Sequence, residues 1–504
     1  MGNVIEMCGI SKAFGSTQAN DGVDFACRAG EVLCLLGENG AGKTTLMKIL
    51  YGMYRPDAGT ISLDGERVSI KSPRDAIRRG IQMVHQHFML VGPLSVTDNV
   101  MIGKEVKSHG LYDRKAAAEK VRALSGEYGL KVPPEKLVRE LSVGEQQRVE
   151  IIKALYQGAR VLILDEPTAV LTPQEVEELF DVINRLRESG KSVIMITHKL
   201  KETMAISDRV YVMRQGRMVG QRKTGETSID ELSEMMVGHQ VARADRVDSE
   251  PGEVILRMEH VALKRKDGGE PLRDVTLEVR RGEILGICGV EGNGQMELAG
   301  VLTATAPGWR GEIWYKGKPI RHTPTAGLLA GGISCIQADR QRDGIAMSLD
   351  VPHNLMMGYQ QTGIFRKHGL LVDWKKIQAA SAGVMEEYDV RPPEPRRALG
   401  EFSGGNQQKF VVGREMMRRP DLMIAAHPTR GVDIQATAFI HGRLLDLKAQ
   451  GAGVLLITAD LDELLQLSDR VAVIYDGRIV GCKKAGEYQL MELGRLMGGG
   501  QSDA

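Results

Sequence analysis

The sequence lacks a long hydrophobic run and any sign of a leader segment. None of its 504 residues lie in a run approaching the ~18 apolar residues that a membrane-spanning helix needs. Residues 1–6 show no basic stretch followed by an apolar one, so we expect no secretory signal. We therefore expect a chain that is soluble by itself and reaches a membrane only through a partner.

An excess of charge and a cysteine framework are also missing. Lys and Arg number 66 against 65 Asp and Glu, which leaves a net charge of +1 and no chain-wide basic field for nucleic acid or an anionic bilayer. The six cysteines show no Cys-x-x-Cys spacing, which argues against a zinc site or a disulfide frame. We expect all six to be small core residues of a protein in a reducing compartment: Cys8, Cys27, Cys34, Cys288, Cys335 and Cys482.

What is present is a phosphate-binding loop. Residues 37–45 contain Gly-x-x-x-x-Gly-Lys-Thr, preceded by the apolar run 32–36 and followed by the helical pattern 46–50. Lys43 would meet the β- and γ-phosphates and Thr44 would give a hydroxyl to Mg²⁺. The alternative is a glycine-rich turn between core elements. The predicted nucleotide-binding residues are Gly37, Asn39, Gly40, Ala41, Gly42, Lys43, Thr44 and Thr45.

The chain repeats itself. Gly37 matches Gly289 at an offset of 289 − 37 = 252, and Ser142 matches Ser403 at 403 − 142 = 261. Further pairs keep these offsets in the same order, which predicts two homologous halves. Apolar runs such as 161–164 and 192–196 alternate with helical patterns such as 175–187, so each half should be α/β with a mostly parallel sheet. The segment from about 95 to 139 has mainly helical patterns and predicts a helical subdomain.

The repeat sets the expected domain boundaries. We expect a first domain at 1–240, a polar linker at 241–252, a second domain at 253–497 and a disordered tail at 498–504.

Two carboxylates follow the apolar run 161–164. In an ATPase with such a phosphate loop, Asp165 would bind Mg²⁺ and Glu166 would be the general base for the attacking water. A simple turn at Asp-Glu-Pro is the alternative, and it fits poorly after a buried strand.

Three further residues are candidates on weaker grounds. His198 follows the next strand and would reach the γ-phosphate, although a structural hydrogen bond is an alternative. Gln86 would bind Mg²⁺ and the attacking water and link them to the helical segment, again with a structural hydrogen bond as the alternative. Phe14 would stack on adenine, with core packing as the alternative.

Residues 141–147 (Leu-Ser-Val-Gly-Glu-Gln-Gln) and 402–408 (Phe-Ser-Gly-Gly-Asn-Gln-Gln) each place a serine and glycine at a helix start, where they would form a second anion site. These two stretches resemble the signature motif of the ATP-binding cassette (ABC) ATPases. Together with the phosphate loop, Gln86, Asp-Glu-Pro and His198, they make the chain resemble that family along its whole length. The resemblance implies two fused cassettes, each with a small antiparallel β part and a helical subdomain, with ATP and Mg²⁺ as cofactors.

More narrowly, the chain resembles the tandem ATPase subunit of bacterial simple-sugar and nucleoside importers, and its nucleoside branch more than its ribose or galactose branch. Residues 165–172 and 428–433 carry the first comparison, and residues 84–91 and 147–156 carry the second. That resemblance implies two transmembrane permease subunits, an extracytoplasmic solute-binding protein, no nucleic acid, and a peripheral place on the cytoplasmic face of the membrane. The permease would dock around residues 93–96 and 351–354.

The second half departs from the pattern at the phosphate loop and at the positions of the carboxylates, Gln86 and His198. Gln295 and Met296 replace Lys43 and Thr44, and the Asp165 and Glu166 positions hold Ala426 and His427. His427 without a metal carboxylate or a phosphate-loop lysine is a poor substitute base. Ala338 stands near the position of Gln86, and Ala459 stands at the position of His198. Around the position of Phe14, residues 264–266 include no aromatic residue.

In the resembled family the two cassettes close head to tail. The intact loop would then face a matching second signature, and the degenerate loop would face Val143 and Thr172, where glycine and aspartate are usual. We therefore expect one hydrolytic composite site and one site kept for its shape. The residues that the second half would supply are Ser403, Gly404, Gly405 and Asp433.

Two other functions share the general layout. Soluble tandem cassettes that act on ribosomes carry a long charged linker and two intact sites, whereas here the linker is short and one site is broken. Cassettes for DNA repair or condensation would need zinc cysteines or long coiled coils. The sequence favours the importer.

Overall fold

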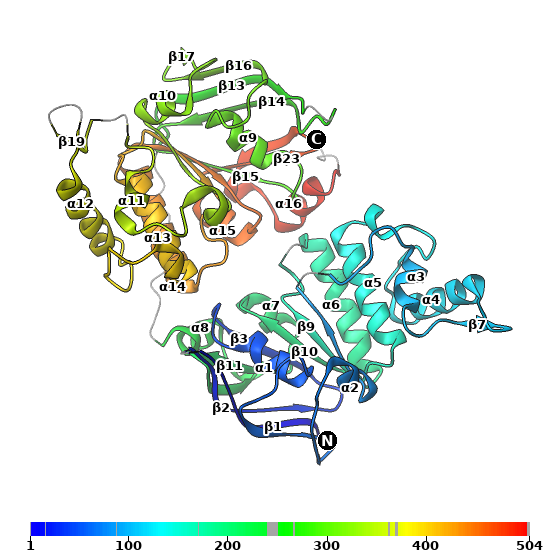
Figure 1. The fold of residues 1–504 in the computed structure, drawn as a ribbon. Helices are drawn as coiled ribbons and strands as arrows, with labels where there is room; N and C mark the ends of the chain where they lie inside the picture. Colours follow the sequence, from blue (N-terminus) through cyan, green and yellow to red (C-terminus); the bar gives the residue numbers. More distant parts are fainter. Residues whose placement is uncertain are drawn as a thin grey trace. The chain divides into compact units, whose positions relative to one another are not determined.

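The computed structural model describes residues 2–15, 17–86, 88–169, 171–238, 250–265, 268–360, 363–367 and 371–500. The chain divides into two compact units, residues 1–241 (unit 1) and 242–504 (unit 2) (Figure 1). Of the predicted linker and tail, only 250–252 and 498–500 lie within the described residues. The boundaries expected at 240 and 253 stay predictions.

Unit 1 contains two larger sheets and a short hairpin. The first sheet is antiparallel, and its strands in spatial order are β2 (Thr17–Arg28), β1 (Asn3–Phe14), β4 (Ala58–Leu63) and β5 (Glu66–Val68). The second is parallel except at its β12 edge, in the order β12 (Arg217–Lys223), β11 (Arg209–Arg214), β3 (Val32–Gly37), β10 (Ser192–Thr197), β9 (Val161–Asp165) and β6 (Ile81–Val84). The hairpin pairs β7 (Lys107–Ser108) with β8 (Leu111–Tyr112).

The parallel sheet positions the site. Strands β3, β9 and β10 are buried along their whole length, as their continuous apolar runs require. Strand β10 pairs in parallel with both β3 and β9. The carboxyl ends of these three strands therefore meet at one edge of the sheet, which is where ligands bind in such folds.

Eight α-helices of unit 1 are described. In Figure 1, α3, α4 and α5 gather on one side of the unit, away from β1 and β2. Helices α3 and α4 lie in the segment predicted as a helical subdomain, and α5 follows that segment. The hairpin β7–β8 within this subdomain has no counterpart in the sequence prediction. The helices are α1 (Lys43–Leu50), α2 (Pro73–Arg78), α3 (Val96–Met101), α4 (Arg114–Tyr128), α5 (Val143–Tyr156), α6 (Pro173–Glu188), α7 (Leu200–Ile206) and α8 (Ile229–Val237).

Unit 2 repeats this plan with one larger sheet. Its order is β17 (Lys318–Pro319), β16 (Arg310–Tyr315), β13 (Val254–Leu263), β14 (Leu272–Arg280), β24 (Arg478–Lys484), β23 (Arg470–Tyr475), β15 (Ile284–Cys288), β22 (Gly453–Ile457), β21 (Leu422–Ala426) and β18 (Ile333–Ile336). A pairing of Asp274 with Arg478 joins its antiparallel and parallel parts. A second hairpin pairs β19 (Arg366–Lys367) with β20 (Leu371–Val372).

The helices of unit 2 follow the same sequence order. In Figure 1, α11, α12 and α13 lie together as the second helical subdomain, so the predicted α/β fold with two cassette-like units is confirmed. The helices are α9 (Gln295–Leu302), α10 (Thr325–Ala330), α11 (Val351–Met356), α12 (Trp374–Glu387), α13 (Gly404–Met416), α14 (Ile434–Ala449), α15 (Leu461–Leu467) and α16 (Leu490–Met497).

The prediction for the cysteines is wrong at two positions. Four of them are buried, but Cys8 and Cys482 are exposed. Side chains alternate across a strand, so Cys8 in β1 faces solvent while its neighbour Met7 faces the core. Across the residues that the structure describes, no helix is long and apolar enough to span a bilayer.

Candidate functional site

The phosphate loop of unit 1 closes around Lys43. Gly42 caps α1 with φ 96°, and a Cβ there would lie 2.2 Å from the carbonyl oxygen of Ala19, so only glycine fits. The Lys43 side chain is buried, and its Nζ donates to the carbonyl oxygens of Gly37 (2.7 Å) and Glu38 (2.8 Å). Burial lowers the pKa of Lys43, while Glu166, Asp165 and Glu38 oppose this. A buried cation at the start of α1 suits a phosphate.

A hydroxyl and a carboxylate meet beside the loop. Thr44 Oγ1 lies 3.4 Å from Oδ1 of the buried Asp165 at the end of β9. Burial and the charge of Glu166 raise the pKa of Asp165, as expected for a carboxylate that a cation would stabilise. Among the described residues no three His, Cys, Asp or Glu side chains could hold a metal. The pair of Thr44 and Asp165 nevertheless fits Mg²⁺, which typically takes one or two carboxylates and fills its shell with phosphate and water oxygens.

Glu166 links the other two candidates. Its Oε1 lies 3.2 Å from Nδ1 of His198, and its Oε2 accepts a hydrogen bond from Gln86 Nε2 at 2.9 Å. The hydrogen bond with His198 is the main reason that the pKa of Glu166 is lowered; burial opposes it. The structure thus brings Gln86, Glu166 and His198 together, with the carboxylate charged and aimed by both neighbours.

The backbone at Glu166 is strained, with φ 47°. His427, at the same position of the repeat (166 + 261), has φ 45°. Unit 2 therefore keeps the backbone turn although it has lost the carboxylate. Burial is the largest cause that lowers the pKa of His427, and Arg430 adds to it, so this imidazole stays neutral near neutral pH.

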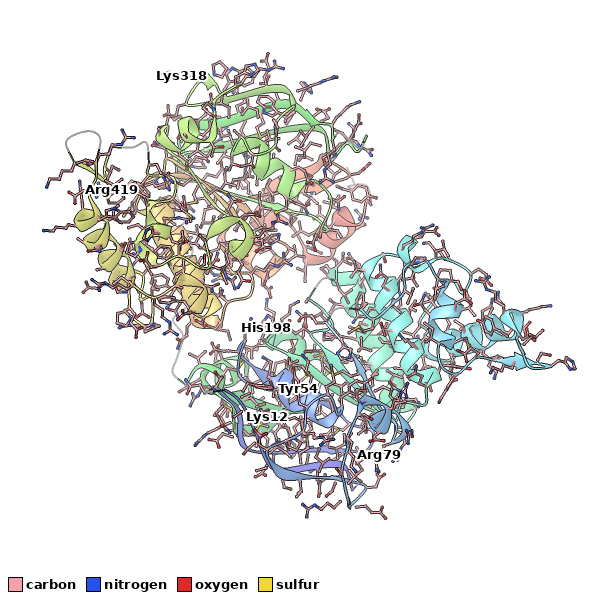
Figure 2. All side chains as sticks on the ribbon, in the orientation of Figure 1. Lys12, Tyr54, Arg79, His198, Lys318 and Arg419 are labelled. Atoms are coloured by element: carbon pink, nitrogen blue, oxygen red, sulfur yellow. The ribbon has the colours of Figure 1, made fainter. Side chains whose placement is uncertain are left out.

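Phe14 lies at the end of β1 and is 44% exposed, so the core-packing alternative does not hold. Its ring packs edge-on against Tyr54 at 5.2 Å between centroids, with Lys12 Nζ 5.6 Å from the ring centre. Figure 2 labels Lys12 and Tyr54 on unit 1. An accessible aromatic face beside a cation is what an adenine would stack on.

The second phosphate loop keeps its shape without its charge. Gly292 and Gly294 have φ 96° and 107°, close to 83° and 96° at Gly40 and Gly42. Gln295 Nε2 donates to the carbonyl oxygen of Val290 at 3.0 Å, as Lys43 Nζ does at Glu38. The amide replaces the hydrogen bond of the ammonium but not its charge. The substitution was predicted from the sequence, but this hydrogen bond was not.

The signature of unit 2 begins α13. Ser403 Oγ accepts hydrogen bonds from Asn406 N (3.4 Å) and Nδ2 (2.8 Å). Asp433 caps α14, and its Oδ2 would lie 3.1 Å from a Cβ at Gly405. Ser403, Gly404, Gly405 and Asp433 are therefore neighbours within unit 2.

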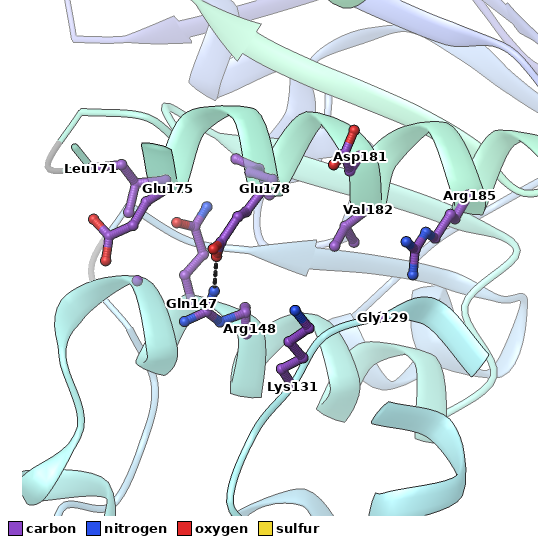
Figure 3. A pocket seen from close by; sticks show the side chains of 12 residues that line it. Gly129, Lys131, Gln147, Arg148, Leu171, Glu175, Glu178, Asp181, Val182 and Arg185 are labelled. Atoms are coloured by element: carbon purple, nitrogen blue, oxygen red, sulfur yellow. Dashed lines mark hydrogen bonds and ion pairs between the residues drawn. The ribbon is translucent and has the colours of Figure 1, made fainter. Parts of the chain in front are cut away.

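The signature of unit 1 is surrounded by carboxylates. Glu145 and Ser142 form a reciprocal capping box at the start of α5. Glu175 Oε1 would lie 2.3 Å from a Cβ at Gly144. Figure 3 shows Glu175 and Glu178 on α6 above α5, with Glu178 hydrogen-bonded to Arg148, in a pocket that Gly144 and Leu171 also line. Acidic groups at this helix start disfavour an anion.

The sequence prediction also missed a hydrogen bond that joins each signature helix to the loop after the strand β9 or β21. Gln147 Nε2 donates to Pro167 O (2.8 Å), and Gln408 Nε2 to Pro428 O (2.7 Å). Both glutamines stand in the repeated Gln-Gln of the two signatures, so the repeat itself was the signal.

Comparison with known proteins identifies the domain. The sequence profile of the ABC transporter family matches residues 20–169 and 272–430. A nucleoside import ATP-binding protein of Lactococcus lactis is 42% identical over 99% of this chain and 98% of its own length. A guanosine import ATP-binding protein of Bacillus subtilis is 43% identical over 98% and 97%. A glucose import ATP-binding protein of Haloferax volcanii is 43% identical over 94% and 92%.

Since the family profile matches one region in each unit, and since relatives above 40% identity align over nearly the whole chain, the protein belongs to the ABC transporter family and carries that family's domain twice.

Proposed function

We propose that this chain is the ATP-hydrolysing, energy-coupling subunit of an importer, with one competent composite site. The first phosphate loop and the signature of unit 2 form that site, and the second loop with the first signature forms a degenerate one. The observation that carries the proposal is the set of side chains in unit 1 (Lys43, Thr44, Asp165, Glu166, His198 and Gln86). Unit 2 keeps the backbone shape and one loop hydrogen bond but none of these side chains.

Each of these side chains of unit 1 has its own role in ATP hydrolysis. Glu166 takes a proton from water as the water oxygen attacks the γ-phosphorus and the bond to ADP breaks. Gln86 and His198 orient Glu166, and Lys43 binds the β- and γ-phosphates. Thr44, Asp165 and Gln86 would hold Mg²⁺, which supplies positive charge at the phosphates when bound. The backbone amides of residues 37–45 cradle the phosphates, and Phe14 stacks on the adenine.

The cargo we propose is a nucleoside, with a simple sugar as the alternative. Two of the relatives named above are nucleoside and guanosine import proteins and one is a glucose import protein. The chain would work on the cytoplasmic face of the membrane with two permease subunits, fed by an extracytoplasmic binding protein.

The permease would dock beside α3 and α11. Val96 and Val351 in the predicted docking segments are buried. Exposed apolar side chains lie in and just before the predicted docking segments, and we propose that they contact the permease: Met89, Val91 and Leu94 in unit 1 and Met347 and Leu349 in unit 2.

The test is transport by the assembled system. A cognate permease is expressed with the chain, and the complex is reconstituted in vesicles with its binding protein and ATP. We expect ATP-dependent nucleoside uptake that exceeds ribose uptake and stops in Lys43→Ala. The melting temperature of the binding protein with each nucleoside and sugar identifies the cargo. An absence of ATP-dependent uptake of either class would refute the proposal.

A further inference from the structure

Arg340 of unit 2 lies in a rigid turn beside the signature. The chain from Val84 to Asn99 in unit 1 spans 99 − 84 = 15 positions, and from Ile336 to Asn354 in unit 2 it spans 354 − 336 = 18. Asn99 and Asn354 each accept a backbone N–H through Oδ1, so they mark the same point. The stretch with three extra residues contains a π-type turn over residues 340–344.

Both ends of this turn are fixed. Asp339 Oδ1 accepts from the backbone N–H groups of Gln341 and Arg342, each at 3.1 Å. At the other end, the buried Arg414 donates from Nη1 to Gly344 O at 2.8 Å. The position of Arg340 is therefore set by the fold before any ligand arrives.

The Arg340 guanidinium is half-buried and lacks a carboxylate partner. Nη1 donates to the carbonyl oxygen of Arg430 at 2.8 Å, but its Nε is buried without a hydrogen-bond partner, and no ion pair of Arg340 occurs within the described part of the chain. Burial lowers the pKa of Arg340 and Asp339 opposes this. Arginine stays charged in proteins, and a desolvated charge without a counter-ion is costly. An anionic ligand would remove that cost.

The signature makes room for this side chain. A Cβ at Gly404 would lie 2.5 Å from Arg340 Nη2, so a larger residue would displace the guanidinium. Unit 1 has Val143 at this position (404 − 261), and its loop at 85–95 has no lysine or arginine. Glycine and arginine thus occur together in unit 2, and both are missing in unit 1.

The remaining charges make the same distinction. Glu145 and Glu175 stand beside the signature of unit 1, and the same positions in unit 2 hold Asn406 and Ala436. Asp433 also lies near the start of α13, and it caps α14 by accepting from Ala436 N at 2.7 Å. The start of α13 is consequently a far better place for an anion than the start of α5.

We propose that Arg340 binds the γ-phosphate of the ATP held by the first phosphate loop, next to Ser403 and the backbone of α13. This rests on the composite site proposed above. A guanidinium presents a planar fork of donors that matches phosphate oxygens, and it stabilises the charge that develops during phosphoryl transfer. The γ-phosphate is absent from ADP, so Arg340 would favour ATP over ADP.

The experiment measures MgATP and MgADP affinity of the full chain in the Glu166→Gln background, where turnover does not interfere. We expect Arg340→Gln to weaken ATP binding about 10- to 100-fold, the range of a lost charged hydrogen bond, and to change ADP binding less than about twofold. Arg340→Lys keeps the charge without the fork and should fall between. Arg342→Gln is the matched control, because this exposed arginine two residues away pairs with Asp343.

Two results would overturn the inference: equal losses of ATP and ADP affinity, which would show a structural role, or unchanged ATP affinity in Arg340→Gln. Ser403→Arg in the same background separates this from the proposed function. If Ser403→Arg weakens ATP binding and Arg340→Gln does not, only the role of Arg340 fails. If neither changes ATP binding, the composite site itself is wrong.

Discussion

His198 Nδ1 lies 3.2 Å from Glu166 Oε1, and this contact joins the ends of two neighbouring parallel strands, β9 and β10. In unit 2 the same positions hold His427 and Ala459, so neither partner of the pair remains. The turn that carries the carboxylate is strained in both units. Its survival in unit 2 without the carboxylate shows that the fold itself maintains the turn.

Glu166→Gln should leave ATP binding intact and lower turnover by about 10²- to 10⁴-fold, because the positioned base is lost. His427→Gln changes the matching residue of unit 2 and should leave turnover within about twofold. Steady-state ATPase rates and nucleotide affinities of both variants give the answer. Near-wild-type turnover in Glu166→Gln would remove this residue from its role.

Ser403→Arg should reduce hydrolysis far more than Ser142→Arg. Both serines cap a signature helix, but the account places a reacting phosphate only at Ser403. The substitutions are matched in size and charge, so their ATPase rates can be compared directly. Equal losses would argue for two working sites.

Unit 2 holds a buried pair that makes a pH-dependent contribution to stability. Glu463 Oε1 lies 3.1 Å from His441 Nε2 and accepts from Thr429 Oγ1 at 2.7 Å. Burial alone would raise the pKa of Glu463, but His441, Thr458 and Thr429 hold it below its ordinary value. The stabilisation is therefore present above the pKa of the unfolded chain, about 4.3, and is lost as the pH falls through the lower folded value.

Glu463→Gln should accordingly destabilise unit 2 by about 1–3 kcal/mol near neutral pH, with a smaller difference from wild type below about pH 4. Calorimetric melting over a pH series measures this. Glu487→Gln, at an exposed position of the same unit, is the control and should shift the melting temperature little. A pH-independent difference for Glu463→Gln would contradict the linkage.

Local motifs explain what could be predicted from the sequence. The loop at 37–45 and the carboxylates after β9 each lie within one stretch of chain, and parallel strands bring their ends together. Gln86 and His198 were weak candidates alone, and the hydrogen bonds to Glu166 join them to it. The roles assigned to these residues stay predictions.

The features that were missed depend on contacts between distant segments. Gln295 Nε2 can make the hydrogen bond that Lys43 makes in unit 1 because the backbone angles of Gly292 and Gly294 keep Val290 O within its reach. Arg340 meets Gly404 only because the turn at 340–344 folds onto α13. A hydrophobic pattern also cannot say which face of a strand is covered, which is why Cys8 was misplaced.

The central claim is that ATP is hydrolysed at one site even when both units are present. Gln295 gives no charge to the phosphates, and the Met296 thioether gives Mg²⁺ no oxygen. Ala426 and His427 stand where unit 1 has its two carboxylates. Because such groups act as a unit, restoring one of them alone should recover little activity.

The most direct measurement compares the ATPase rates of Lys43→Ala and Gln295→Ala in the complex with the permease. Both variants remove the side chain that bonds its own phosphate loop. The account predicts that Lys43→Ala eliminates turnover and that Gln295→Ala keeps most of it. If Gln295→Ala silences the enzyme as fully as Lys43→Ala, the one-site account is wrong.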